Sequence, residues 1–170
     1  MYKKKPLFIT FEGIEGSGKS YQALRLYKNL KKKNISSILT REPGGTRSAE
    51  KIREVILKDY FHPESKEKFN KYTDTLLYLA ARNEHLENKI RPAIKKKKII
   101  ICDRFIDSTS AYQIYGKGVN KNFINSIHKY ILQGIKPNLT FVLIANISKA
   151  MKRLNKRKNK NRYDKFTRDF

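Results

Sequence analysis

A glycine-rich segment, Gly13-Ile-Glu-Gly-Ser-Gly-Lys-Ser20, constrains the fold of this chain more than any other feature. It matches the pattern G-x-x-x-x-G-K-[ST] without a mismatch. A short apolar run of strand-forming residues, Leu7–Phe11, precedes it, and Ser20–Lys33 has apolar positions at helical spacing. A strand, a glycine-rich turn and a helix are the context that a phosphate-binding loop requires. The sequence therefore predicts a P-loop that binds a nucleotide.

Each part of this loop has a chemical reason. Glycines let consecutive backbone N–H groups turn toward a phosphate, and the N-terminus of the following helix adds partial positive charge. Lys19 can reach the β- and γ-phosphates, and the Ser20 hydroxyl can bind Mg²⁺. The residues expected to hold the nucleotide are Gly13, Ile14, Glu15, Gly16, Ser17, Gly18, Lys19 and Ser20. The alternative is a plain glycine-rich turn that joins a strand to a helix.

Strands and helices are expected to alternate along the rest of the chain. Apolar runs typical of buried strands occupy Ser37–Thr40, Ile99–Cys102 and Leu139–Ile144. Helical spacing predicts helices over Ala49–Lys58, Asn70–Lys89, Ile106–Tyr115, Asn122–Leu132 and Ser148–Lys158. Pro92 is expected to end or kink the second of these helices. No repeat or linker divides the 170 residues, so we predict one α/β domain with a parallel sheet flanked by helices.

Asp103 closes the most apolar of the expected strands. In a doubly wound sheet, ligands bind beyond the carboxyl ends of the strands, so Asp103 and the P-loop should face one crevice. We expect Asp103 to bind a metal ion together with Ser20. The alternative is a surface Asp that caps the next helix. Arg104 follows directly and could meet a second phosphate near the same strand end.

The chain is strongly basic, with 39 Lys and Arg against 15 Asp and Glu and a formal net charge of +24. The basic runs Lys31–Lys33, Lys95–Lys98 and Lys152–Lys160 show no arginine-aromatic interleaving and no nucleic-acid-binding motif. A specific nucleic-acid partner is therefore not expected. Solvated surface charge is the main interpretation, and nonspecific polyanion binding is the alternative.

Other features predict a cytoplasmic protein without a membrane partner. The apolar run after Met1–Pro6 is too short for a signal peptide, and no run approaches the roughly 18 apolar residues of a membrane span. The lone Cys102 lies in an apolar run and is expected to be a core residue in a reducing compartment. His62, His85 and His128 sit at no metal-ligand spacing, and we expect them at the surface or half-buried.

Four further segments narrow the choice among P-loop proteins: Arg41-Glu-Pro-Gly-Gly-Thr46, Leu79-Ala-Ala-Arg82, Asp103-Arg-Phe105 followed by Ser108, and Ala111-Tyr-Gln113. With the P-loop, and in this order from about residue 7 to the C-terminus, they resemble the thymidylate kinase family. The resemblance implies a P-loop NTPase fold of the nucleoside monophosphate kinase type. It also implies transfer of the γ-phosphoryl group of ATP to dTMP with Mg²⁺, in dTTP biosynthesis. Because the family is dimeric, a homodimer through helices flanking the Asp103 region is expected.

The resemblance also implies roles at the acceptor nucleotide. Glu15 stands near the deoxyribose 3′-hydroxyl, Arg41 helps to place the acceptor phosphate, and Arg104 contacts that phosphate. Tyr112 crowds the sugar 2′ position and so favours deoxyribose. No Ser-His-Asp or Cys-His set is evident, and none is needed, because the acceptor phosphate is already largely dianionic at neutral pH.

At the base, the resemblance implies that Tyr78 stacks on thymine where the family usually has Phe. Arg82 and Gln113 are expected to hydrogen-bond the base. Tyr78 and Tyr112 could instead be plain core aromatics. A buried, unpaired Arg is costly in any fold, so Arg82 and Arg104 need anionic or acceptor partners.

A mobile lid is expected at about residues 150–165. The P-loop contains no arginine, and in the family that version accompanies arginines in the lid. Arg153, Arg157 and Arg162 lie in the matching basic stretch, and we expect Arg153 and Arg157 to join Lys19 and Arg104 in catalysis. The alternative is that they belong to a solvated basic helix.

The sequence ends before the C-terminal elements of the family, so we expect these to be absent, among them an edge strand beside Leu139–Ile144. A truncated sequence, a decayed gene and a minimal enzyme protected by a dimer partner are three open explanations. Alternative functions follow: a catalytically impaired nucleotide-binding remnant, a P-loop kinase for another nucleoside or nucleotide, and a polyanion-binding protein.

Overall fold

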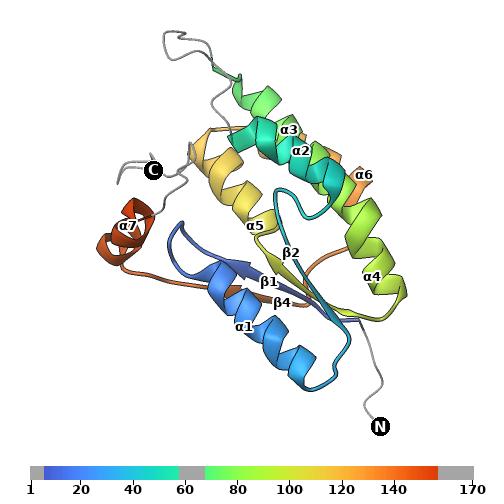
Figure 1. Cartoon of the computed structure of the whole chain (residues 1–170). Helices are drawn as coiled ribbons and strands as arrows, with labels where there is room; N and C mark the ends of the chain where they lie inside the picture. Colours follow the sequence, from blue (N-terminus) through green and yellow to red (C-terminus); the bar gives the residue numbers. More distant parts are fainter. Residues whose placement is uncertain (1–5, 58–67, 157–170) are drawn as a thin grey trace.

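A four-stranded parallel sheet forms the centre of the computed structural model in Figure 1, in which residues 6–57 and 68–156 are described. The strand order is β2-β3-β1-β4. The strands are β1 (Phe8–Glu12), β2 (Ser37–Arg41), β3 (Ile99–Asp103) and β4 (Leu139–Val142). The α/β fold predicted from the sequence is confirmed.

Helices follow each strand and cover the sheet on both faces (Figure 1). They are α1 (Lys19–Lys32), α2 (Arg47–Leu57), α3 (Lys71–His85), α4 (Arg91–Lys95), α5 (Ile106–Thr109), α6 (Lys121–Leu132) and α7 (Ile147–Asn155). Two π-helical segments, η1 (Leu86–Ile90) and η2 (Ser110–Gly116), continue α3 and α5. Every helix expected from the sequence is present within the described residues, with bounds that differ by a few residues.

The alternation of side chains along the strands divides the core into two clusters. The cluster under η1, α4 and α6 contains Phe8, Ile100 and Cys102 from the strands, with Leu86, Ile90, Ala93 and Phe105. The cluster under α1 contains Ile9, Phe11 and Ile101, with Ala23. Because each face of the sheet buries its own set, the strand register is fixed.

That register brings chemically important residues together at one end of the sheet. Asp103 on β3 pairs with Phe11 on β1 and with Arg41 on β2. The P-loop leaves the carboxyl end of β1 at the same edge. The crevice predicted beyond the strand ends therefore lies between the P-loop, Arg41 and Asp103.

Of the two outcomes expected at Pro92, an end or a kink of the helix, the structure contradicts the first. The chain passes from α3 through η1 into α4, where Pro92 lies in the first turn. The N–H of Arg91 bonds to the carbonyl of Leu86, five residues back. Because the first turn of a helix needs no N–H from its proline, the chain continues helically to Lys95.

β4 lies at the edge of the described sheet and pairs with β1. It ends at Val142, two residues before the end of the predicted strand. Its side chains are more exposed than those of the central strands: Phe141 is 43% exposed and Val142 is 65% exposed. Within the described sheet this strand is therefore an edge strand with a partly exposed apolar face.

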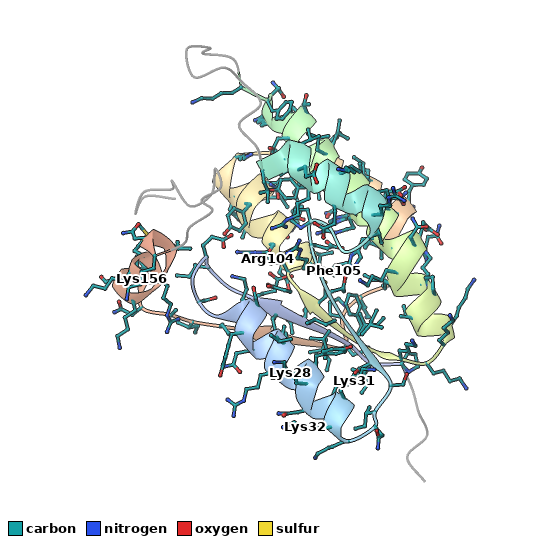
Figure 2. All side chains as sticks on the ribbon, in the orientation of Figure 1. Lys28, Lys31, Lys32, Arg104, Phe105 and Lys156 are labelled. Carbon is teal, nitrogen blue, oxygen red and sulfur yellow. The ribbon has the colours of Figure 1, made fainter. Side chains whose placement is uncertain are left out.

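The lysines lie mostly outside the two core clusters. Figure 2 shows Lys28, Lys31 and Lys32 projecting from α1, whereas Arg104 and Phe105 lie inside the molecule. Lys28, Lys31 and Lys32 are exposed, and Phe105 is fully buried. Among the described residues, no helix is both long and apolar enough to cross a membrane.

Candidate active site

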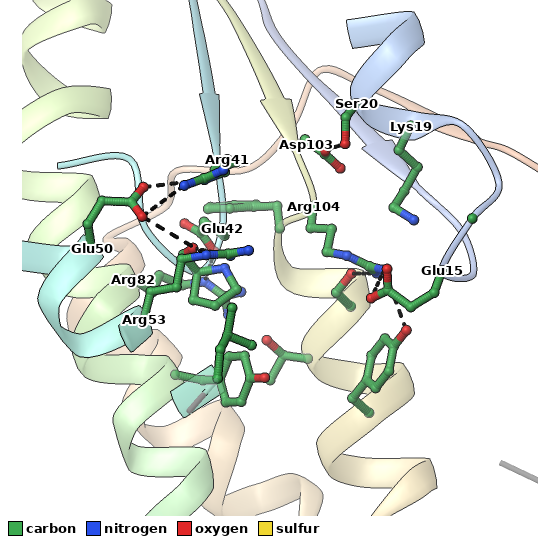
Figure 3. Close-up of a pocket in the computed structure, with 18 of the residues that line it drawn as sticks. Glu15, Lys19, Ser20, Arg41, Glu42, Glu50, Arg53, Arg82, Asp103 and Arg104 are labelled. Atoms are coloured by element: carbon green, nitrogen blue, oxygen red, sulfur yellow. Dashed lines mark hydrogen bonds and ion pairs between the residues drawn. The ribbon is translucent and has the colours of Figure 1, made fainter. Parts of the chain in front are cut away.

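A cleft of about 870 Å³ opens at the carboxyl ends of the strands. Figure 3 shows charged side chains from several elements pointing into it. Of the residues singled out in the sequence, the cleft is lined by Glu15, Gly16, Gly18, Lys19, Ser20, Arg41, Tyr78, Arg82, Asp103, Arg104, Tyr112, Gln113 and Arg153. Gly13, Ile14 and Ser17 belong to the P-loop without lining the cleft, and Arg157 lies outside the described residues.

The P-loop lysine is held by the loop that carries it. Lys19 Nζ donates a hydrogen bond to the Ile14 carbonyl oxygen at 2.6 Å and lies 3.5 Å from Ser17 Oγ. Burial, and then the nearby Arg104 cation, lower the pKa of Lys19 to about 8. The ammonium group is therefore held by oxygen atoms of the P-loop itself, and it loses its proton more readily than an ordinary lysine.

Ser20 and Asp103 meet as the sequence predicted. The Ser20 hydroxyl donates to Asp103 Oδ2 (Figure 3). The other carboxylate oxygen, Oδ1, is buried and has no hydrogen-bond partner among the described residues. An unpartnered buried oxygen is costly, so this atom suits a cation that is supplied with the ligand.

Arg104 and Glu15 form an ion pair on the P-loop side of the cleft. Arg104 Nη2 lies 2.6 Å from Glu15 Oε1, and Nη1 donates to Ser108 Oγ at 3.0 Å. The guanidinium also lies over the Tyr112 ring, 5.3 Å from its centroid. Burial opposes the charge of Arg104, but Glu15 and Tyr112 hold the pKa of Arg104 above its ordinary value. Arg104 has φ of +72°, a conformation that is uncommon outside glycine and that clusters at functional sites.

Glu12, which the sequence did not single out, bonds to the residues that follow Arg104. Its carboxylate accepts hydrogen bonds from the Phe105 N–H at 2.7 Å and from Ser108 Oγ at 2.6 Å. Burial raises the pKa of Glu12 despite these bonds. The position of Glu12 at the end of β1, beside the P-loop, was the only signal that the sequence offered.

Arg41 lies at the opposite wall with a second arginine that the sequence analysis missed. Arg41 Nη2 pairs with Glu50 Oε2 at 2.9 Å. Arg53 Nη1 donates to the Pro43 carbonyl oxygen at 2.7 Å and also lines the cleft. Burial, followed by the Arg41 cation, lowers the pKa of Arg53. Glu50 lies 2.9 Å from Arg41 and 4.0 Å from Arg53 and also lines the cleft, so this wall holds two arginines around one carboxylate.

The far end of the cleft contains a buried ionic network. Arg82 Nε donates to Glu42 Oε2 at 2.7 Å, and His85 Nδ1 lies 2.9 Å from Glu42 Oε1. The side chains of Arg82 and Glu42 are each only 4% exposed. Burial by itself would raise the pKa of Glu42, but the Arg82 cation and the contact with His85 lower it. Glu42 is therefore an anion that holds Arg82 in place.

His85 is fully buried, so the expectation of a surface or half-buried histidine was wrong. Its Nε2 lies 2.6 Å from Thr40 Oγ1, and the ring is pressed against the glycine-rich turn after β2. A Cβ at Gly45 would lie 2.6 Å from His85 Nε2, so only glycine fits there. The three-residue spacing from Arg82 places His85 on the same helical face, which was an available signal. His128 is half-buried as expected, and His62 lies outside the described residues.

Tyr78 on α3 and Gln113 on η2 line the same cleft as Arg82. Gln113 is almost fully buried, and its Nε2 has no hydrogen-bond partner among the described residues. A buried amide that points into a cleft indicates a ligand atom that accepts a hydrogen bond.

α7 packs against the P-loop from the other side. Arg153 Nη1 donates to the Gly16 carbonyl oxygen at 3.0 Å. A Cβ at Gly16 would lie 2.6 Å from the Ala150 carbonyl oxygen, so this contact also requires glycine. The predicted lid at about residues 150–165 is only partly within the described residues, which end at residue 156.

The fold, the P-loop with Lys19, and a cleft lined by arginines define a P-loop phosphotransferase for a phosphorylated acceptor. The thymidylate kinase family model matches residues 11–170. The thymidylate kinase of Halothermothrix orenii is 41% identical over 96% of this chain and 76% of its own length. That of Mesoplasma florum is 44% identical with the same coverage. A crystal structure of thymidylate kinase from Ehrlichia chaffeensis has a TM-score of 0.73 at 36% identity, covering 87% of this chain and 81% of its own. The chain belongs to the thymidylate kinase family, whose members are phosphoryl-transferring enzymes.

Proposed function

We propose that this cleft transfers the γ-phosphoryl group of ATP to dTMP, giving ADP and dTDP, the reaction that the family is named for. The observation that supports it most is a pair of buried side-chain atoms in cleft-lining residues that have no hydrogen-bond partner among the described residues. Asp103 Oδ1, whose carboxylate is bonded to Ser20 of the P-loop, suits a cation, whereas Gln113 Nε2 on η2 suits an acceptor atom of a base. A cleft that offers both atoms fits a phosphate donor and a nucleotide acceptor together.

At the donor end, the P-loop and Lys19 bind the ATP phosphates. Ser20 and Asp103 would hold Mg²⁺, since the free carboxylate oxygen fits a cation that the nucleotide also binds. When bound, Mg²⁺ neutralises charge that develops on the phosphates. Among the described residues no group of three or more His, Cys, Asp or Glu side chains could hold a metal ion. This agrees with Mg²⁺ being held through one or two carboxylates plus substrate phosphates.

The acceptor phosphate lies between the two walls. Arg104 contacts it from the P-loop side, and Arg41 with Arg53 face it from the other wall. Glu15, paired with Arg104, lies near the deoxyribose 3′-hydroxyl, and Tyr112 crowds the 2′ position. The acceptor phosphate is a dianion near neutral pH and needs no general base, so these residues act by positioning and by neutralising charge.

The base lies at the far end, with Tyr78 on its face and Arg82 and Gln113 at its edge. Arg82 has only N–H donors, and the unpartnered Gln113 atom is also a donor. An edge rich in carbonyl oxygens, as in thymine, satisfies these donors. Cytosine has an amino group in place of one of these carbonyl oxygens. A donor there would face the N–H donors of Arg82 and Gln113, so dTMP should be a better substrate than dCMP.

α7 completes the site. Arg153, bonded to the P-loop backbone, and Arg157, outside the described residues, would supply further positive charge to the transferring phosphoryl group. The lid at about residues 150–165 would carry both residues within a single kinase domain. An arginine in such a role is worth on the order of 10³–10⁵ in rate.

A coupled ADP-release assay with ATP, Mg²⁺ and a panel of nucleoside monophosphates tests the proposal on the full chain. We expect turnover with dTMP to exceed turnover with dCMP, dGMP and dAMP. Gln113→Leu should reduce the preference for dTMP over dCMP, whereas Tyr130→Leu, at an exposed position of α6, should leave it unchanged. No turnover of dTMP by a folded chain that binds ATP would contradict the proposal.

Two further proposals rest on the family resemblance. The chain forms a homodimer through helices that flank the Asp103 region, which light scattering after size-exclusion chromatography tests. It acts in the cytoplasm, which cell fractionation tests. A monomer at assay concentration with full activity would remove the first of these proposals.

A further inference from the structure

The guanidinium of Arg82 forms hydrogen bonds to residues from two different segments and also lies over the ring of Phe105. Its Nε donates to Glu42 Oε2 at 2.7 Å, from the segment after β2. Its Nη1 lies 2.7 Å from His128 Nε2, on α6. The guanidinium carbon lies 5.1 Å from the centroid of the Phe105 ring. Nη2 has no hydrogen-bond partner in residues 6–57 and 68–156, and Arg82 lines the cleft.

The chemistry of arginine fixes what His128 must do. A guanidinium has no acceptor atom, so His128 Nε2 must accept the bond and the ring proton must be on Nδ1. This requires an uncharged imidazole. Burial, and then the Arg82 cation, lower the pKa of His128 to about 4, so the ring is neutral under ordinary conditions. The bond between Arg82 and His128 is therefore charge-assisted and stronger than a bond between neutral groups.

We propose that His128 is a positioning residue for base recognition. With Glu42 it fixes the plane of the Arg82 guanidinium so that Nη2 points at the base. This inference rests on the proposed function, in which Arg82 contacts thymine. It assigns a role in substrate selection to α6, an element that contributes no residue to the lining of the cleft.

Two hydrogen bonds are needed because a single one leaves the guanidinium free to rotate. A single bond from Nε to Glu42 fixes one edge, and the ring of Phe105 supports one face. Rotation of the side-chain end would still displace Nη2 relative to the base. A second bond, from Nη1 to a different helix, removes that freedom. Errors of about 1 Å in such a contact can cost on the order of 10² in rate.

A pair of amide variants tests the proposal without introducing an apolar group. Gln places its carbonyl oxygen near the position of Nε2, whereas Asn is one methylene shorter and does not reach Arg82. His128→Gln should retain KM for dTMP and the preference for dTMP over dCMP. His128→Asn should raise KM for dTMP about tenfold, since a bond to a charged group is lost. KM for ATP should stay unchanged in both. Lys129→Asn, an exposed neighbour on α6, is the control.

A second readout does not depend on turnover. Slow rotation of a doubly bonded guanidinium gives separate ¹⁵N resonances for the Nη groups of Arg82, and loss of one bond averages them. Separate resonances are expected in the native chain and in His128→Gln, and averaged ones in His128→Asn. Equal kinetics and equal spectra for His128→Gln and His128→Asn would overturn the proposal. A chain that prefers another monophosphate would overturn the proposed function, while the spectra would still decide whether His128 orders Arg82.

Discussion

The two ends of the cleft are built in different ways. At the P-loop end, binding groups come from a contiguous segment, Gly13–Ser20, and the key side chains are bonded mainly to that segment or to its neighbours Asp103 and Arg104. At the opposite end, where we propose that the base binds and which we call the base end, Glu42 from the segment after β2 forms a buried network with Arg82 and His85 of α3. The binding groups of the P-loop end are therefore placed by the local conformation of one segment, whereas those of the base end are placed by contacts between distant segments. A change in the first should damage the reaction, and a change in the second should damage the fold and the selection of substrate.

The largest effect should come from Lys19→Ala. This change removes the cation that reaches the ATP phosphates, so we expect kcat to fall by about 10³. The melting temperature should stay within a few degrees, because the loop is not part of either core cluster. Steady-state ADP release and a thermal melt measure the two quantities, with Lys28→Ala on the outer face of α1 as the control. Unchanged turnover would remove the P-loop from the mechanism.

Glu42→Leu should instead reduce stability. It leaves the buried Arg82 cation and the Nδ1–H of His85 without their acceptor, and breaking a buried pair costs about 3–5 kcal/mol. The free energy of unfolding in urea measures this loss. Glu54→Leu, whose pair with Lys51 is largely exposed, should cost below about 1 kcal/mol. Similar losses of unfolding free energy in the two variants would mean that the buried network stabilises the fold no more than an exposed ion pair does.

Asp103→Asn tests the metal at the P-loop end. The amide keeps the shape of the side chain but removes the charge beside the unpartnered oxygen, so the Mg²⁺ concentration for half-maximal activity should rise about 10–100-fold. A titration of MgCl₂ at saturating ATP measures it. Asp107→Asn, on the exposed side of α5, should leave the Mg²⁺ requirement unchanged. A requirement that also stays unchanged in Asp103→Asn would exclude this carboxylate from metal binding.

The smallest effect near neutral pH is a pH dependence at the P-loop end. The folded pKa of Lys19 is about 8, lowered from 10.5, and only the protonated ammonium attracts phosphate. In the free enzyme, kcat/KM for ATP should therefore fall as pH rises above about 8, approaching about tenfold per pH unit. Bound phosphates raise this pKa, so kcat at saturating ATP should stay level to higher pH. A profile of kcat/KM that is flat from pH 7 to 10 would contradict the assignment.

The difference between the two ends also explains what could be predicted from the sequence. The P-loop was recognisable because its residues are consecutive, and Asp103 was recognisable because parallel strands end at one edge. Glu42, His85 and His128 were missed as a set, since their contacts join positions 40 or more residues apart. The π-helical segments η1 and η2 were also missed, because apolar spacing over a few residues does not distinguish them from α-helix. Arg53 gave no signal beyond being one of many basic residues.

The buried network at the base end limits the routes by which the sequence can diverge. Loss of Glu42 leaves Arg82 unpaired, and loss of Arg82 leaves Glu42 unpaired, so either first step passes through a weakened protein. Gly45 is constrained by the same network, because the Cβ of any other residue there would collide with His85. For the stability of the fold alone, replacement of the whole set by well-packed apolar residues would cost less than any single step toward it, but it would also remove the arginine that we propose contacts the base. In descendants of this sequence, these positions should therefore change together or not at all, whereas the exposed lysines of α1 are free to drift one at a time.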